Sequence, residues 1–132
     1  MSVLELNGRV FDASTTGTLT LTGEGSATTD VTQGLAKAWA FYNGTGTVAV
    51  SDSLNVSGIT DNGTGDYTLT FSNSMGNATF GGGSSNSSNE ANGANHQMHV
   101  FATGSLRFRA ENSGGTLTDS SRLVFNVQGD LA

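Results

Sequence analysis

The chain has 132 residues, a formal net charge of −6 and neither cysteine nor proline. A chain of this length is expected to form one domain that buries a core without metals or disulfides. The lack of cysteine excludes disulfide frameworks, thiolate metal sites and cysteine nucleophiles. Only five Lys and Arg side chains are available to attract nucleic acid, and no apolar run approaches the length of a membrane span. We expect no nucleic-acid partner and no membrane insertion.

Charged residues make up 12% of the chain, about half the usual share for a soluble domain. Thr, Ser, Asn and Gly must therefore cover most of the surface. Such a surface lacks the lysines that usually keep exposed strand edges from pairing with neighbouring chains. This favours edges that are capped within a homo-oligomer; the alternative is a monomer with short, twisted edges.

Residues 1–34 predict a hairpin or arm and a first strand, as part of the same unit as the rest. Two apolar clusters flank Asn7-Gly8, a pair that commonly makes a tight hairpin turn. Alternatively, the segment is an arm that reaches a neighbouring subunit or a mount. Residues 17–23, GTLTLTG, alternate Leu with Thr, which predicts a strand with one wet face. Residues 24–34 are polar and predict a connection.

Residues 35–72 predict a four-stranded antiparallel meander, because three turn signals separate four short runs of strand-type residues. In the first run Leu35, Trp39 and Phe41 share one parity and form a bulky face. We expect this face, with Trp39, to pack in the core. Gly58 falls where the alternation of apolar residues slips, which indicates a β-bulge.

Residues 73–97 are rich in Gly, Ser and Asn and predict a long surface loop at one end of the domain. Binding residues are most often found on such loops, and a flexible spacer is the alternative. Tyr42 adjoins a turn and is a further candidate for ligand contact. The candidate binding residues are Tyr42, Asn86, Asn89, Asn92 and Asn95.

Strands are also predicted at 98–103, 106–111 and 123–127. In the second of these, Leu106 and Phe108 face inward while Arg107 and Arg109 face outward. Roughly eight to ten short strands separated by Gly, Asn and Ser turns are typical of a sandwich or barrel. The predicted fold is therefore an all-β, antiparallel β-sandwich over residues 35–132, jelly-roll-like and assembled as a trimer.

His96 and His99 are weak candidates for a metal site, since neutral imidazoles bind transition metals. Positions three apart on a strand face opposite sides, so one chain does not easily chelate with both unless residue 96 lies in the loop. A trimer can instead bring three copies of one histidine to its axis. Structural sites need three or four ligands, so we assign no metal and no cofactor.

Catalysis requires a nucleophile beside a base, or two carboxylates in an apolar cleft. Serine and aspartate lie in turn and loop contexts, and no G-x-S-x-G elbow occurs. We therefore expect that the protein is not an enzyme.

The stretch AKAWAFYNGTGTVAV at 36–50 continues as SDSLNVSGITDNGTGDYTLTFS at 51–72. It resembles a module that recurs in bacteriophage virion proteins, especially near the ends of tail-fibre proteins. A weaker similarity returns where SGGTL at 113–117 leads into Asp119-Ser120 and a final strand. The resemblance implies a small homo-oligomeric fibre, spike or tip component, made in the host cytoplasm and located in the virion.

Host-cell attachment is the role that this resemblance implies, and the implied partners are the chain itself, other virion proteins and a host-surface glycan or receptor. One alternative is a capsid decoration protein that stabilises the shell through the N-terminal arm. An alternative from another class is a carbohydrate-binding module that uses Tyr42 and the long loop.

Overall fold

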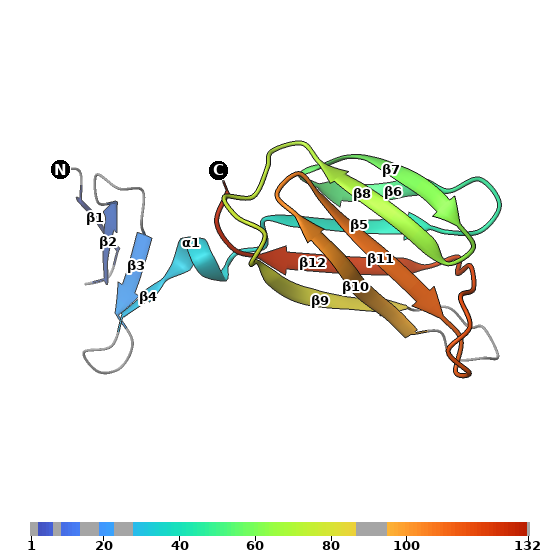
Figure 1. Cartoon of the computed structure of the whole chain (residues 1–132). Coiled ribbons are helices and arrows are strands. Elements are labelled where there is room, and N and C mark those ends of the chain that lie inside the picture. Colours follow the sequence, from blue (N-terminus) through green and yellow to red (C-terminus); the bar gives the residue numbers. More distant parts are fainter. Residues whose placement is uncertain (1–2, 7–8, 14–18, 23–27, 87–94, 132) are drawn as a thin grey trace. The chain divides into compact units, whose positions relative to one another are not determined.

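The computed structural model is built mainly of strands (Figure 1). The residues that it describes are 3–6, 9–13, 19–22, 28–86 and 95–131. Among them, no helix is long and apolar enough to cross a membrane. By its internal contacts the chain divides into two compact units, Met1–Leu35 and Ala36–Ala132.

The first unit is a small antiparallel sheet in the order β1-β2-β3-β4, followed by one helical turn. Its elements are β1 (Val3–Leu6), β2 (Arg9–Ala13), β3 (Leu19–Thr22), β4 (Thr28–Asp30) and α1 (Val31–Gly34). β1 and β2 pair on either side of Asn7-Gly8, which themselves lie outside the described residues.

Two predictions for this region need correction. Residues 1–34 form a compact unit of their own and not a part of the sandwich unit, because their strands pair with one another. Residues 24–34 contain β4 and α1, where only a connection is predicted. The strand expected within 17–23 is confirmed as β3.

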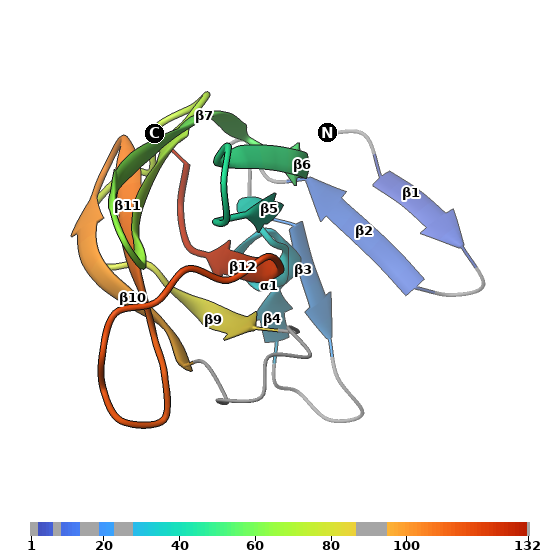
Figure 2. The ribbon, with the colours of Figure 1, turned by 90° about the vertical axis from the view of Figure 1, so that its right-hand side faces the viewer.

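The second unit is a sandwich of two four-stranded antiparallel sheets, as predicted (Figures 1 and 2). We call them the β5–β12 sheet, in the order β6-β5-β12-β9, and the β8–β11 sheet, in the order β10-β11-β8-β7. The strands are β5 (Ala38–Asn43), β6 (Ala49–Leu54), β7 (Val56–Gly63), β8 (Asp66–Phe71), β9 (Gly81–Asn86), β10 (Asn95–Ala102), β11 (Ser105–Glu111) and β12 (Leu123–Gln128).

Aromatic rings fill the space between the two sheets. Tyr42, Tyr67, Phe108 and Phe125 are fully or almost fully buried. The Phe108 and Phe125 ring centroids lie 4.8 Å apart, and those of Tyr42 and Tyr67 lie 5.7 Å apart in an edge-to-face arrangement. Aromatic pairs in this geometry stabilise by about 0.5–1.5 kcal/mol beyond the area they bury. These contacts join the two sheets into one core.

The small-residue face of β5 points into this core, which corrects the prediction that Trp39 packs there. Ala38, Ala40 and Tyr42 have no exposed surface, while Trp39 and Phe41 alternate with them and are half-buried. The rings of the opposite sheet occupy the interior, so alanine fits at most inward positions of β5. The bulky residues are therefore left on the outer face.

The predicted meander over residues 35–72 is also wrong, because its strands belong to two sheets. β5 pairs with β6 and β7 pairs with β8. Between the two hairpins Asn55 has a φ of 57°, a left-handed conformation that turns the chain. Its side chain accepts from the backbone N–H of Asn73 at 2.7 Å. The bulge predicted at Gly58 is confirmed by the register shift between Val56 and Gly58.

The long loop predicted over 73–97 contains a strand instead. β9 pairs with β12 from Gly81 to Asn86, and β10 already begins at Asn95. Gly82 explains why a Gly-rich run can pair here: a Cβ at this position would lie 2.1 Å from the carbonyl oxygen of Asn126. Only glycine permits that approach.

The sandwich has two distinct ends. Ala38 pairs with Val127, so the chain enters and leaves at one end, which we call the entry end. The turns that follow β5, β7 and β11 lie at the opposite end, which we call the far end (Figure 1).

Candidate functional site

Tyr42, predicted as a binding residue, is buried in the core and is not available to a ligand. Its hydroxyl group lies 2.7 Å from Nε2 of His96, and Nδ1 of His96 lies 3.3 Å from the carbonyl oxygen of Val124. A carbonyl only accepts, so Nδ1 carries the proton and Nε2 accepts from the tyrosine hydroxyl group. The pair links β5 to β10 across the core.

His96 is consequently unsuited to the metal site considered from sequence. Both of its ring nitrogens are engaged, and its ring stacks on Phe108 with centroids 4.8 Å apart. Burial lowers the pKa of His96 to about 4, and burial raises the pKa of Tyr42 above its usual range. Both groups are neutral at physiological pH and serve as a structural contact. His99, also on β10, is exposed.

Of the four predicted asparagines, the structure describes Asn86 and Asn95. Asn86 ends β9, where its Oδ1 accepts from Ser120 Oγ at 3.0 Å, and Asn95 starts β10 with an exposed side chain. Asn89 and Asn92 lie outside the described residues. A binding loop built from all four therefore stays a prediction.

A partly buried hydrogen-bond network holds the far-end turns together, and sequence reasoning missed it. Asp119 Oδ1 accepts from the backbone N–H of Gly65 and from the Tyr67 hydroxyl group, each at 2.7 Å. The same hydroxyl group lies 2.9 Å from the carbonyl oxygen of Gly44, whose N–H donates to Ser120. Burial, followed by the Asp119 contact, raises the pKa of Tyr67. Three turns are thus fixed relative to one another.

The outer face of the β5–β12 sheet carries half-buried aromatic side chains. Two rows of paired residues cross its four strands, Leu54–Trp39–Asn126–Gly83 and Asp52–Phe41–Val124–Ser85. We call these two rows the aromatic face. Leu54 is 47% exposed, and the two rings beside it are in part accessible. Exposed apolar groups of this kind mark interaction sites.

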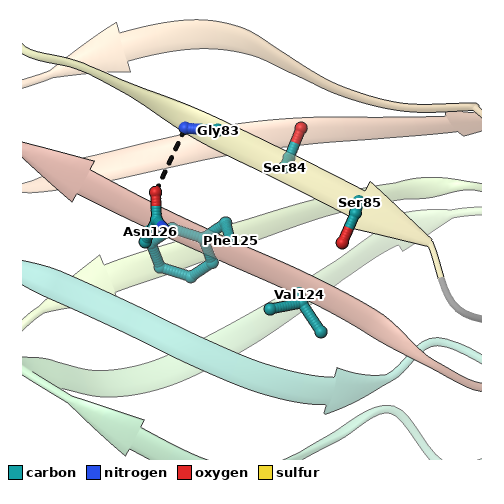
Figure 3. Close-up of a pocket in the computed structure, with 6 residues that line it drawn as sticks. All are labelled: Gly83, Ser84, Ser85, Val124, Phe125 and Asn126. Atoms are coloured by element: carbon teal, nitrogen blue, oxygen red, sulfur yellow. Dashed lines mark hydrogen bonds between the residues drawn. The ribbon is translucent and has the colours of Figure 1, made fainter.

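A shallow hollow of about 240 Å³ lies at the β9 side of the aromatic face. It is lined by Gly83, Ser84, Ser85, Val124, Phe125 and Asn126 (Figure 3). The Asn126 side-chain oxygen accepts from the Gly83 N–H at 3.3 Å, which fixes the amide at the edge of the hollow. Val124 and Asn126, which line the hollow, pair with Phe41 and Trp39 on the neighbouring strand, so the aromatic residues lie one strand away from the hollow, in the same two rows.

The outer face of the β8–β11 sheet is polar. We call its outward residues Thr60, Thr68, Thr70, Asp66, Arg107 and Arg109 the threonine face. Nε and Nη2 of Arg107 donate to the two carboxylate oxygens of Asp66 at 2.7 and 2.6 Å, and this bond lowers the pKa of Asp66. Asn62 bridges Asp66 and Thr68. These groups largely bind one another.

No protein-family model matches the chain, and neither a curated protein nor a solved structure is significantly similar to it. The candidate site therefore stands on its own geometry. The signal for it was present in the sequence as the two parities of residues 35–42. The choice of which parity faces inward depended on rings in strands far along the chain.

Proposed function

We propose that this chain is a small homo-oligomeric component of a bacteriophage virion, a fibre, spike or tip, that serves attachment to the host cell. The aromatic face carries the proposal. Trp39 and Phe41 lie outside the buried core, half-buried on the outer face of β5, and pair with two residues that line the hollow. The resemblance of residues 36–72 to tail-fibre modules adds the virion setting, in which three jelly-roll-like copies would assemble.

The support for self-association comes from exposed apolar side chains at the entry end and not from backbone pairing between strand edges. Register shifts interrupt the pairing of the edge strands β6, β7 and β10, but not that of the fourth edge strand, β9, and such bulges hinder edge-to-edge pairing. At the entry end, however, Val100, Phe101 and Leu131 are 46%, 37% and 44% exposed. In this proposal these three side chains form the contact between copies and leave the aromatic face free.

Light scattering tests the assembly. We expect a mass near three times 13.5 kDa, and a shift toward 13.5 kDa when Val100 and Phe101 are both replaced by serine. A wild-type monomer at all concentrations would contradict the oligomer.

Cell adsorption tests the attachment role. Labelled protein is mixed with a panel of bacterial strains, and strains that retain it after washing are challenged with phage in the presence of unlabelled protein. We expect retention and protection from infection, both lost in Trp39→Ala. Thr70→Ala on the threonine face is the matched control and should behave as wild type. Retention that is the same in both variants would reject the aromatic face as the attachment surface.

A capsid decoration protein is the second candidate, favoured by the separate N-terminal unit with its own four-stranded sheet. Such a unit can dock on a shell while the sandwich projects. Binding of the purified protein to emptied capsids at fixed stoichiometry would support this candidate, and adsorption to cells without capsid binding would exclude it.

A further inference from the structure

We propose that the hollow beside Trp39 and Phe41 is a binding site for one neutral pyranose sugar of a host-surface glycan. The proposal rests on the attachment role above and adds the ligand class and the residues that receive it. It also moves sugar binding from Tyr42, which is buried, to the opposite face of the same strand.

The glycines of β9 indicate that the hollow is not required by the fold. At Gly82 an added Cβ would lie within 3 Å of both Asn126 and Val127, so glycine is needed there for strand pairing. At Gly83 the nearest atom to an added Cβ is Asn126 Oδ1 at 3.7 Å, an ordinary contact, and at Gly81 nothing lies within 4 Å. Both keep an ordinary negative φ. A side chain at Gly83 would fit the protein but would occupy the hollow.

The surroundings of the hollow suit a sugar ring. A pyranose has an apolar face of C–H groups and a rim of hydroxyl groups, and it needs an aromatic or aliphatic surface beside a few fixed polar groups. Val124 supplies apolar surface in the hollow, and the half-buried Trp39 and Phe41 continue it one strand further along the two rows. The Asn126 amide, held by its bond to Gly83, and the exposed Ser85 supply donors and acceptors at the rim.

Charge favours a neutral sugar over an acidic one. Within the two rows of the aromatic face the charged residue is Asp52, which pairs with Phe41 and is exposed. A uronic or sialic acid within the rows would meet this carboxylate, and the nearest cations along these strands, Lys37 and Arg122, precede β5 and β12 and lie outside the two rows. The arginine pair lies on the threonine face, where Asp66 already fills the fork of Arg107.

The test uses the purified full chain and a panel of glucose, galactose, mannose, N-acetylglucosamine and glucuronic acid. Trp39 is the chain's single tryptophan, so its fluorescence reports on this face directly. We expect saturable quenching or shift of its emission by at least one neutral sugar. Glucuronic acid should bind at least tenfold more weakly than the matching glucose.

Gly83→Val is the decisive variant, because its side chain fills the hollow, and we expect at least a tenfold loss of sugar affinity. Gly81→Val, on the same strand and face but outside the hollow, should bind as wild type. Unfolding curves of both variants confirm that they fold. If Gly83→Val does not fold, Trp39→Phe, which keeps an aromatic ring, should retain more affinity than Trp39→Ala.

Three outcomes would overturn the proposal: no saturable binding by any neutral sugar, equal affinity of folded Gly83→Val and wild type, or a change in oligomeric mass in Gly83→Val without a change in sugar affinity. The last would make this face a contact between copies. Failure of the attachment role is distinguishable, since sugar binding by the purified protein would then persist without adsorption to cells.

Discussion

The two outer faces of the sandwich differ although both sheets bury the same kind of inner face. Most polar groups of the threonine face are satisfied within the protein, since Asp66, Arg107, Asn62 and Thr68 bind one another, although Arg109 Nε is buried without a hydrogen-bond partner among the described residues. The aromatic face instead leaves Trp39 half-buried and Gly83 open at a hollow. Polar groups that bind each other need no partner, whereas half-exposed rings gain free energy when a ligand covers them. This difference is why we propose binding at the aromatic face.

The largest effect is expected where the two sheets share their core. Phe108 is fully buried and contacts His96 and Phe125, so Phe108→Ala should lower the free energy of unfolding by about 3–5 kcal/mol. Both sheets should unfold together, in one transition measured in urea. Phe41→Ala on the aromatic face is the control and should cost less than half as much. Equal losses would mean that Phe41 belongs to the core.

Acid should loosen the contact between the sheets. The pKa of His96 falls from 6.5 to about 4 on folding, so its contribution to stability is fully present above pH 6.5. It declines as pH falls toward 4, because the unfolded chain binds the proton first. The loss over this window is about 3 kcal/mol by the usual 1.36 kcal/mol per pKa unit.

Unfolding free energies measured from pH 7 to 4 test this slope. His96→Gln should remove the dependence of the unfolding free energy on pH over this range, while His99→Gln, which changes an exposed histidine on the same strand, should keep it. If the pH dependence persists in His96→Gln, other titratable groups cause it. The Asp66 carboxylate has a lowered pKa, so its contribution is lost only below the ordinary range of an aspartate.

Two neighbouring glycines of β9 test whether the hollow is needed for folding. Gly82→Ala forces a methyl group against β12 and should destabilise by about 1–3 kcal/mol, as overpacking does. Gly83→Ala adds a methyl group at the hollow and should change the unfolding free energy by less than about 1 kcal/mol. Backbone entropy favours alanine over glycine in a strand. Thermal unfolding of both variants measures the contrast. Equal destabilisation would show that the hollow is needed for folding.

A smaller effect than in the core is expected on the threonine face. Asp66→Asn removes the ion pair with Arg107, in which the Asp66 side chain is 10% and the Arg107 side chain 40% exposed, and pairs near the surface contribute about 0–1 kcal/mol. The loss should be smaller than that of Phe108→Ala or Gly82→Ala and should shrink in high salt. Urea unfolding at low and high salt measures it. A loss of unfolding free energy as large as that of Phe108→Ala would mean that the ion pair is part of the core and not of the surface.

The sequence allowed the fold class to be predicted, because alternation in Tyr67–Phe71, Leu106–Ala110 and Leu123–Val127 matches the buried positions. It did not determine which parity of β5 faces inward, since that depends on rings from β8 and β11. The turn at Asn55 also directs β7 and β8 into the second sheet, so the expected meander is not formed. The strand at Gly81–Asn86 has no apolar alternation, so only its pairing with β12 reveals it.

The candidate site was predicted less well. His96 and Tyr42 have the right chemistry for a ligand but are turned toward each other in the core. The hollow arises from the absence of side chains at Gly83 and from pairing between distant strands, and neither is visible as a motif. Trp39 and Phe41 were recognised as sharing one face of β5, but that face was placed on the inner side of the sheet.

Acrylamide quenching of the single tryptophan, Trp39, tests most directly whether this ring lies half-exposed on a binding face. We expect the fluorescence of the folded protein to be quenched to an extent intermediate between that of a buried tryptophan and that of the unfolded chain, and a bound sugar to protect the ring. Emission typical of a buried indole, with no quenching at any protein concentration, would place Trp39 in the core and contradict its position on the aromatic face.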